Sequence, residues 1–275
     1  MPLRTAVVLL RCTHPEPSFA VTALATTLAI AAGRGLGSAW VAAAVLSGQF
    51  SVGWGNDLLD MNRDRVAGRQ DKPLATGEID PVTVSRAAIA AFALAVVLSL
   101  VSGLAAAAAH VLALLLAHAY NHALKNGPWS VVPYAVAFAM LPVFVTLGLG
   151  SRAHLPAWWA VLAAAMIGAA AHFTQTLPDL GRDAATGVRG LPQRMGARPS
   201  LLVVGLLLSG GALVAALGPG GAVPAVAVVS LGVTLALALA VLVAGAAGRY
   251  LAAFRLTLAA AAGAVATFLL TGRPL

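Results

Sequence analysis

Long apolar segments, separated by short polar or glycine-rich turns, follow one another along almost the whole chain. A helix of roughly 20 apolar residues crosses a bilayer core of about 30 Å. By this criterion we expect an all-helical, polytopic membrane protein, a bundle of nine transmembrane helices around a central cavity. The predicted spans are about 18–33, 38–56, 82–104, 107–124, 130–149, 156–177, 200–217, 222–246 and 250–271. We expect residues 1–275 to form a single transmembrane domain with charged loops at about 56–81 and 178–199.

The composition agrees with a membrane protein and excludes an ordinary soluble domain. Hydrophobic residues make up 60% of the 275 residues and charged residues only 9%, whereas soluble domains contain about 25% charged residues. The single cysteine, Cys12, excludes a disulfide framework and fits no cysteine-based metal site. The segment from Met1 to Pro17 has neither the apolar core nor the cleavage site of a signal peptide.

The basic residues are distributed unevenly between the two sides of the predicted bundle. With nine spans and the N-terminus inside, 14 of the 17 Lys and Arg residues lie inside, and only Arg34, Arg152 and Arg273 lie outside. This positive-inside bias places the N-terminus and both charged loops on the cytoplasmic side. The formal charge of +8 then reflects topology, and we expect no nucleic-acid partner. All nine acidic residues also fall inside, which the topology rule does not explain and which indicates a functional site.

Five of the nine acidic residues lie in one charged stretch, Gly55 to Ile79: Asp57, Asp60, Asp64, Asp71 and Glu78. On a helix, Asn56, Asp60 and Asp64 fall at i, i+4 and i+8, and Asp57 at i−3 from Asp60, so the four share one face. Carboxylates stacked in this way repel one another and require a cation. Their oxygens suit a hard ion, and the stretch predicts Mg²⁺ shared with a phosphate.

A second charged stretch repeats this spacing. Gln175, Asp179 and Asp183 again fall at i, i+4 and i+8, and Arg189 downstream corresponds to Arg69 of the first stretch. Because the stretches end the second and sixth predicted spans, we expect them to face each other across the bundle. Two such clusters would bind two or more Mg²⁺ ions and a diphosphate, with flanking Arg and Lys contacting the remaining oxygens.

The two motifs resemble those of the UbiA-type intramembrane prenyltransferases. The pattern N-D-x-x-D-x-x-x-D at 56–64, followed by R-x-x-K-P-L-x-x-G at 69–77, is similar to the first signature of that family. The pattern D-x-x-x-D at 179–183, with Gly187 beyond it, is similar to the second. The resemblance covers essentially the whole chain and implies nine helices, both motifs on the cytoplasmic side, and a cavity that opens laterally to lipid.

The resemblance also implies an activity: Mg²⁺-assisted loss of diphosphate from an allylic isoprenyl diphosphate, then capture of the carbocation by a lipophilic, aromatic acceptor in the membrane. Tyr120 and Lys125 match a Tyr and a diphosphate-contacting Lys of the family. We expect catalytic roles for Asp60, Asp64, Asp179, Asp183, Lys125 and Tyr120. We expect Mg²⁺ ligands at Asn56, Asp57, Asp60, Asp64, Asp179 and Asp183. We expect binding of the metal–diphosphate group at Asn56, Asp57, Arg69, Lys72, Arg189 and Gln175.

Two departures from the family pattern bear on the substrate. Thr176 stands where many members carry an acid, which leaves the second motif one carboxylate short. The second predicted span has no Arg, and Gln49 is the strongly polar residue in its middle, which disfavours hydroxybenzoate as the acceptor.

Other functions remain open at this point. A UbiA-type terpene cyclase would convert the isoprenyl diphosphate without an acceptor and would need aromatic rings around a migrating cation. A transporter would place charged groups near the bilayer midplane, whereas the acids here lie at one side. The first acidic face could also be a solvated loop neutralised by Arg63, Arg65 and Arg69. Finally, His118 and His122, at i and i+4, are a possible metal pair.

Overall fold

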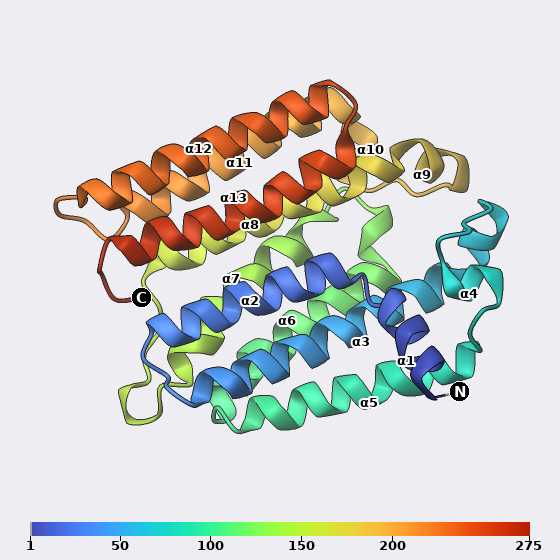
Figure 1. Cartoon of the computed structure of the whole chain (residues 1–275), viewed down its shortest axis with the longest axis horizontal. Coiled ribbons are helices and arrows are strands. Elements are labelled where there is room, and N and C mark those ends of the chain that lie inside the picture. Colours follow the sequence, from blue (N-terminus) through green and yellow to red (C-terminus); the bar gives the residue numbers. More distant parts are fainter. Residues whose placement is uncertain (1) are drawn as a thin grey trace.

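The structure, a computed structural model, describes residues 2–275, which form helices and turns with no β-strand among them (Figure 1). The α-helices are α1 (Pro2–Arg11), α2 (Pro15–Ala31), α3 (Gly37–Val66), α4 (Pro73–Thr76), α5 (Pro81–Leu100), α6 (Leu104–His122), α7 (Val131–Leu147), α8 (Trp158–Thr176), α9 (Leu180–Thr186), α10 (Leu191–Met195), α11 (Ala197–Leu217), α12 (Ala225–Ala246) and α13 (Tyr250–Leu270). Three short 3-10 turns connect them: η1 (Leu124–Asn126), η2 (Gly150–Arg152) and η3 (Leu177–Asp179). The predicted all-helical class is confirmed.

Helix ends coincide with residues that favour them. Pro81 occupies the first turn of α5, and the Asp80 side chain caps that helix by accepting a hydrogen bond from the Thr83 N–H at 3.1 Å. Gly77 and Gly187 follow α4 and α9 with φ of 77° and 80°, a left-handed conformation that favours glycine. Each glycine therefore turns the chain after a charged motif.

Six helices are long and apolar enough to cross a membrane: Pro81–Leu100, Leu104–His122, Trp158–Thr186, Ala197–Leu217, Ala225–Ala246 and Tyr250–Leu270. The predicted multi-pass membrane protein is confirmed to that extent. The remaining predicted spans correspond to α2 and α7, with 17 residues each, and to α3, with 30. The total of nine crossings stays a prediction.

The long helices lie in two groups that share a core. In Figure 1, α2, α3, α5, α6 and α7 form the lower group, and α8, α11, α12 and α13 form the upper group. The largest hydrophobic cluster crosses both groups and includes Phe144 of α7, Trp159 of α8 and Phe268 of α13. At the seam, a Cβ atom on Gly168 of α8 would lie 2.6 Å from Phe138 of α7, so glycine permits this close helix packing.

Both motif-bearing helices are longer than the sequence indicated. Instead of ending near residue 56, α3 continues to Val66; its 30 residues span about 45 Å. The second motif lies on a run of 29 residues, Trp158–Thr186, which contains η3 at Pro178. The predicted loops at about 56–81 and 178–199 are therefore wrong in part, since residues 56–66 and 180–186 are helical. Pairing with basic side chains lets these acidic segments remain helical beyond the apolar spans.

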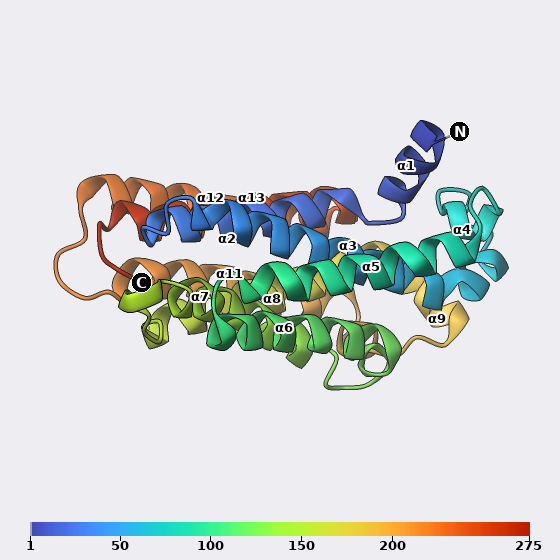
Figure 2. The ribbon, with the colours of Figure 1, turned by 90° about the horizontal axis from the view of Figure 1, so that it is seen from below.

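The motif segments gather at one end of the bundle, where Figures 1 and 2 place α1, α4 and α9. At the opposite end, Arg152 donates a hydrogen bond to the Gly33 carbonyl at 3.1 Å, and Arg34 donates one to Ser102 Oγ at 2.8 Å. Two of the three basic residues expected outside thus lie together, away from both motifs. Which end faces the cytoplasm stays a prediction.

The sequence did not indicate α1, which covers the motif end of α3 and α5. Val8 and Cys12 are buried in a cluster with Leu74, Ile79 and Val84. In Figure 2, α1 leans away from the bundle axis. The N-terminal segment therefore packs on the chain that connects the first motif to α5.

Candidate functional site

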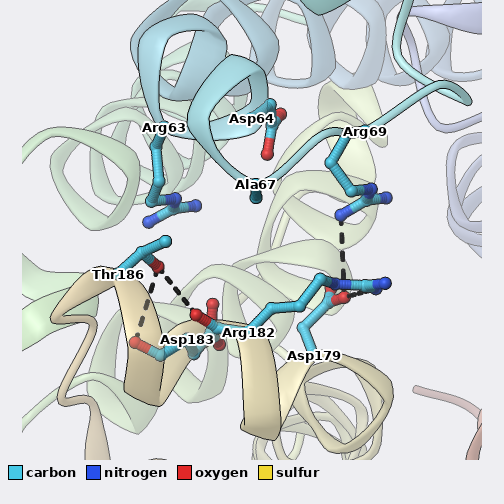
Figure 3. Close-up of a pocket in the computed structure, with 8 residues that line it drawn as sticks. All are labelled: Arg63, Asp64, Ala67, Arg69, Asp179, Arg182, Asp183 and Thr186. Atoms are coloured by element: carbon cyan, nitrogen blue, oxygen red, sulfur yellow. Dashed lines mark hydrogen bonds and ion pairs between the residues drawn. The ribbon is translucent and has the colours of Figure 1, made fainter.

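The two acidic motifs face each other across a small cavity (Figure 3). The end of α3 and the turn after it supply one wall, and η3 with α9 supplies the other. The cavity encloses about 30 Å³, which is room for roughly one water molecule. Its lining residues are Arg63, Asp64, Ala67, Arg69, Asp179, Arg182, Asp183 and Thr186. The predicted juxtaposition of the two motifs is therefore present.

Asp60 is held by basic and amide groups from several elements. Its carboxylate forms an ion pair with Lys125 of η1, and it accepts hydrogen bonds from Arg63 Nη2 at 2.6 Å and Asn56 Nδ2 at 3.2 Å. Asn56 Nδ2 also donates to Asn121 Oδ1 at 3.3 Å. The sequence-predicted residues Asn56, Asp60 and Lys125 thus form one connected group.

Asp57 has a different environment from the other acids of the motif. Its side chain is only 1% exposed, and Oδ1 contacts Lys72 Nζ at 2.5 Å and His14 Nε2 at 3.0 Å. His14 adopts φ 53°, a left-handed conformation that costs a non-glycine residue about 1–2 kcal/mol. Asp57 does not line the cavity. The contacts make it the buried counter-ion of Lys72, and its predicted role as a metal ligand stays a prediction.

Asp64 is the least engaged carboxylate of the first motif. It lines the cavity, is 8% exposed, and makes no side-chain hydrogen bond or ion pair within residues 2–275. Burial raises the pKa of Asp64, and the nearby charges of Lys72 and Arg69 oppose that shift. A buried carboxylate with vacant lone pairs beside three arginines can accept a cation without losing a protein contact.

Arg69 joins the two motifs. Its guanidinium donates two hydrogen bonds to Asp71, at 2.8 and 2.6 Å, and Nη1 lies 3.6 Å from Asp179 Oδ1. The fork-like contact with Arg69 holds the pKa of Asp71 well below its usual range. Arg69 therefore pairs with an acid of the first charged stretch, Asp71, and also with Asp179 of the second motif.

The second motif has more exposed carboxylates than the first. Asp179, whose side chain is 37% exposed, pairs with Arg182 three residues later. Asp183 accepts a hydrogen bond from Gln193 Nε2 at 2.7 Å. Thr176, which stands in place of a family acid, donates to the Phe173 carbonyl at 2.9 Å. Its hydroxyl is satisfied within the helix.

Besides Asn56, Asp57, Asp60, Lys72 and Lys125, three more predicted residues are absent from the cavity lining. Gln175 Nε2 donates to Tyr134 Oη at 2.6 Å rather than to either motif. The Tyr120 ring is buried edge-on against Tyr134, with ring centroids 4.9 Å apart. The Arg189 side chain is exposed, and the Arg189 carbonyl accepts a hydrogen bond from Arg194 Nε at 2.7 Å. Their predicted roles stay predictions.

The sequence reading missed a group of residues that fixes the loop after the second motif. Ser130 Oγ accepts a hydrogen bond from the Leu191 N–H at 2.8 Å and pairs with buried His172 Nε2 at 3.1 Å. A Cβ atom on Gly190 would lie 2.6 Å from the Lys125 carbonyl. The loop that leads to Gln193 therefore packs directly on the segment that carries Lys125. In the sequence, the one indication of this group is that Gln193 follows Asp183 of the second motif by ten residues.

The contacts bear on two alternatives from the sequence. The first acidic face is no solvated loop, because Asp57, Asp60 and Asp64 are 1%, 7% and 8% exposed. His118 Nε2 contacts Ser51 Oγ at 3.1 Å, so one nitrogen of this imidazole already has a protein partner. The possible metal pair of His118 and His122 stays untested.

The donors at the cavity nevertheless fit Mg²⁺ shared with a phosphate ligand. Proteins commonly hold Mg²⁺ by one or two carboxylates and leave the other positions to substrate phosphates and water. Asp64, Asp179 and Asp183 supply hard oxygen donors from both walls, and Arg63, Arg69 and Arg182 surround them. This donor set suits a metal–diphosphate group better than an all-protein metal cage.

Comparisons with known proteins bear on the fold and the family. A model of the UbiA prenyltransferase family matches residues 17–270. The apo structure of a UbiA homologue from Aeropyrum pernix K1 superposes with a TM-score of 0.75 at 20% identity, over 92% of this chain and 96% of that one. A UbiA homologue from Archaeoglobus fulgidus bound to GPP and Mg²⁺ gives 0.70 at 18% identity, over 95% and 99%.

A structure described as that of digeranylgeranylglyceryl phosphate synthase gives a TM-score of 0.67 at 15% identity, over 96% of this chain and 97% of that one. These structural likenesses show a shared fold. No curated protein sequence matches the chain.

Proposed function

The chain belongs to the UbiA prenyltransferase family, and from this premise we propose that it transfers an isoprenyl group from an allylic isoprenyl diphosphate to a lipophilic, aromatic acceptor in the membrane, with Mg²⁺ as its cofactor. The observation that carries the proposal is the cavity between the motifs, lined by three carboxylates and three arginines. A related structure with GPP and Mg²⁺ supports the same pairing of metal and diphosphate.

The acidic residues would hold the metal from both walls. Asp64, Asp179 and Asp183 line the cavity, and Asp60 lies one helical turn from Asp64. Asn56 and Asp57 would support them from behind. When bound, Mg²⁺ neutralises diphosphate charge and so favours its departure.

The basic residues would bind the diphosphate oxygens and stabilise the charge that grows as the carbon–oxygen bond breaks. Arg63, Arg69 and Arg182 already face the cavity. Lys125, now paired with Asp60, would exchange that contact for a diphosphate oxygen. Lys72 is held by Asp57 and reaches the diphosphate only if that pair opens.

We assign the whole chain to one membrane-embedded domain with a central cavity that opens laterally to lipid. The N-terminus and both motifs would face the cytoplasm, as the distribution of basic residues indicates. The isoprenyl tail would then extend from the motif end into the apolar interior, away from water.

A terpene cyclase is the second candidate, because a specific cluster favours it. Tyr120, Tyr134 and His172 are in mutual ring contact, with centroids 4.9 to 5.4 Å apart. Phe173 lies 5.8 Å from His172. Aromatic faces steady a cation, so this cluster would suit a migrating carbocation as well as an aromatic acceptor. No observation supports a transporter in the same way, since the segments that carry the motifs gather at one end of the bundle (Figure 1).

The test is incubation of the purified protein with dimethylallyl, geranyl or farnesyl diphosphate and Mg²⁺, with and without a membrane lipid extract. Extract-dependent prenylated product is the expected result. Hydrocarbon formed without extract would select the cyclase. Absence of diphosphate release under both conditions, or release that persists in EDTA, would contradict both functions.

A further inference from the structure

A second, larger recess lies beside the motif end, and none of its lining residues lines the cavity between the motifs. This groove measures about 770 Å³. One side is Pro178, in the 3-10 turn of the second motif. The other is the turn between α12 and α13 and the start of α13, and the complete lining is Pro178, Gly248, Arg249, Tyr250, Leu251, Ala252, Arg255 and Leu256.

The charge in the groove is not balanced. Arg255 is paired with Glu16 of α2 through hydrogen bonds of 2.6 and 2.9 Å. Arg249 is exposed, and no described residue forms a hydrogen bond or an ion pair with its side chain. Two guanidinium groups thus face one carboxylate, which leaves one positive charge for an external anion. The first turn of α13 lacks a side-chain cap, so its N–H groups add to the positive potential there.

The remaining lining is apolar and lies where lipid headgroups are found. α12 and α13 are both long and apolar enough to cross a membrane, and the groove lies at the turn that joins them. Leu251 is 52% exposed, and Tyr250 occupies a helix end, a position typical of the interfacial aromatic belt. A soluble anion would leave this apolar surface uncovered, whereas a phospholipid matches the guanidinium with its phosphate and the apolar wall with its chains.

We infer that the groove binds the phosphate headgroup of an anionic membrane phospholipid, with Arg249 as the main contact. Basic recesses between helix ends on the cytoplasmic side are a recurrent type of anionic-lipid site. The binding does not require the prenyl-transfer reaction. Because Pro178 directly precedes Asp179, a bound headgroup would contact the 3-10 turn that carries the second motif.

The test compares bound lipids on the intact protein by native mass spectrometry. The probes are phosphatidylglycerol and phosphatidylcholine with identical acyl chains. Wild type should prefer phosphatidylglycerol, and R249Q should lower that preference about fivefold, the effect expected for one arginine near an anionic surface. The matched control is R198Q, which removes an exposed arginine at the start of α11 that pairs with no described residue and should keep the wild-type preference. Unchanged thermal unfolding of R249Q would exclude a folding defect.

Three results would overturn the inference. If wild type bound the two lipids equally, there would be no site for an anionic headgroup. If R249Q and R198Q lost the same share of the preference for phosphatidylglycerol, that preference would reflect net charge alone. Displacement of phosphatidylglycerol by excess inorganic phosphate would assign the groove to a free anion instead of a lipid. Prenyl-transfer activity is measured separately, so its failure would leave these binding results standing.

Discussion

The first motif lies on an unbroken α-helix, whereas the second lies on a helix that changes to a 3-10 turn at Pro178. Proline donates no backbone hydrogen bond, and short 3-10 segments within helices often mark hinges. Asp57, Asp60 and Asp64 are buried, while the Asp179 side chain is 37% exposed. The two motifs share a sequence spacing but not an environment.

The burial of the ion pairs differs as well. Asp57 and Asp60 pair with Lys72, His14 and Lys125, which lie 15 to 65 residues away in the chain. Asp179 pairs with Arg182 at i+3 and, at 3.6 Å, with Arg69 of the first motif. The buried pairs fix the first motif before any ligand arrives, and the more exposed pairs of Asp179 leave the second freer to adjust. We therefore interpret the first motif as the preformed half of the site and the second as the adjustable half.

The largest expected difference between the halves is found at Asp60 and Asp179. Replacing Asp60 with Ala should abolish diphosphate release and also lower the free energy of unfolding by about 3 kcal/mol, since Lys125, whose side chain is 11% exposed, would lose its counter-ion. Asp179→Ala should abolish or strongly reduce turnover but change that free energy by less than about 1 kcal/mol, because its carboxylate is 37% exposed in its ion pairs with Arg182 and Arg69. Denaturation in detergent and a diphosphate-release assay measure both. Equal stability losses at the two positions would remove the distinction.

Lys125 should carry a large part of catalysis. Lys125→Ala is expected to lower kcat about a hundredfold, because an oriented donor to a departing oxyanion is worth about 3 kcal/mol. Arg86→Ala is the control: Arg86 is exposed on α5 and lies outside both motifs. If both variants lowered kcat by the same small factor, Lys125 would not contact the diphosphate and would only add to the positive charge on that side of the membrane.

Gln193 tests whether the second motif depends on its loop. Gln193→Ala removes the 2.7 Å hydrogen bond to Asp183, and residues that orient metal ligands typically contribute tenfold or more to metal affinity or activity. We expect the Mg²⁺ concentration for half-maximal activity to rise about tenfold with little change in thermal stability. Gln193→Glu should be worse, because a second carboxylate would face Asp183. A normal Mg²⁺ dependence in both variants would contradict the positioning role.

Asp57 sharpens the comparison within the first motif. As the counter-ion of Lys72 it should matter more for stability than for metal binding, so Asp57→Asn is expected to lower the unfolding free energy by about 3 kcal/mol. Its half-maximal Mg²⁺ concentration should stay within about threefold of wild type. A metal-affinity loss as large as that of Asp64→Asn would instead make Asp57 a ligand.

Asp71 should show the smallest effect and a defined pH dependence. Its folded pKa is depressed by Arg69, so its contribution is fully present above the unfolded pKa of about 3.9. That contribution is lost as pH falls through the lower folded value. Asp71 is mostly exposed, and Asp71→Asn should therefore cost less than about 1 kcal/mol at pH 7. Unfolding curves at pH 7 and pH 3 should show the difference between variant and wild type shrink at the lower pH. If the stability difference between variant and wild type instead grew at pH 3, the pKa of Asp71 would be raised and not lowered in the folded protein.

Much of the site could be predicted from the sequence because it rests on helical periodicity. The i, i+4, i+8 spacing of Asn56, Asp60 and Asp64 places them on one face wherever the helix ends, and Asp179 and Asp183 follow the same rule. Apolar length likewise predicted the helical class. Local rules of this kind need no knowledge of the tertiary arrangement.

What could not be predicted depends on contacts between distant segments. Nothing local indicates that His14 approaches Lys72, that Asn121 contacts Asn56, or that Ser130 holds Leu191. The extension of α3 to Val66 also exceeded the prediction, because apolar length marks the membrane crossing and not the end of the helix. The different burial of the two motifs belongs to this same class of tertiary effects.

The central claim is that carboxylates of both motifs bind one metal–diphosphate group. The most direct measurement is a double-mutant cycle on the affinity for geranyl thiolodiphosphate, a non-reactive analogue, in saturating Mg²⁺, with Asp64→Ala, Asp183→Ala and the double variant. Both residues line one cavity, so each single change should weaken binding at least about tenfold. The double change should add little, giving a coupling energy of about 1 kcal/mol or more. Strictly additive losses, or unchanged affinity in either single variant, would contradict a shared site.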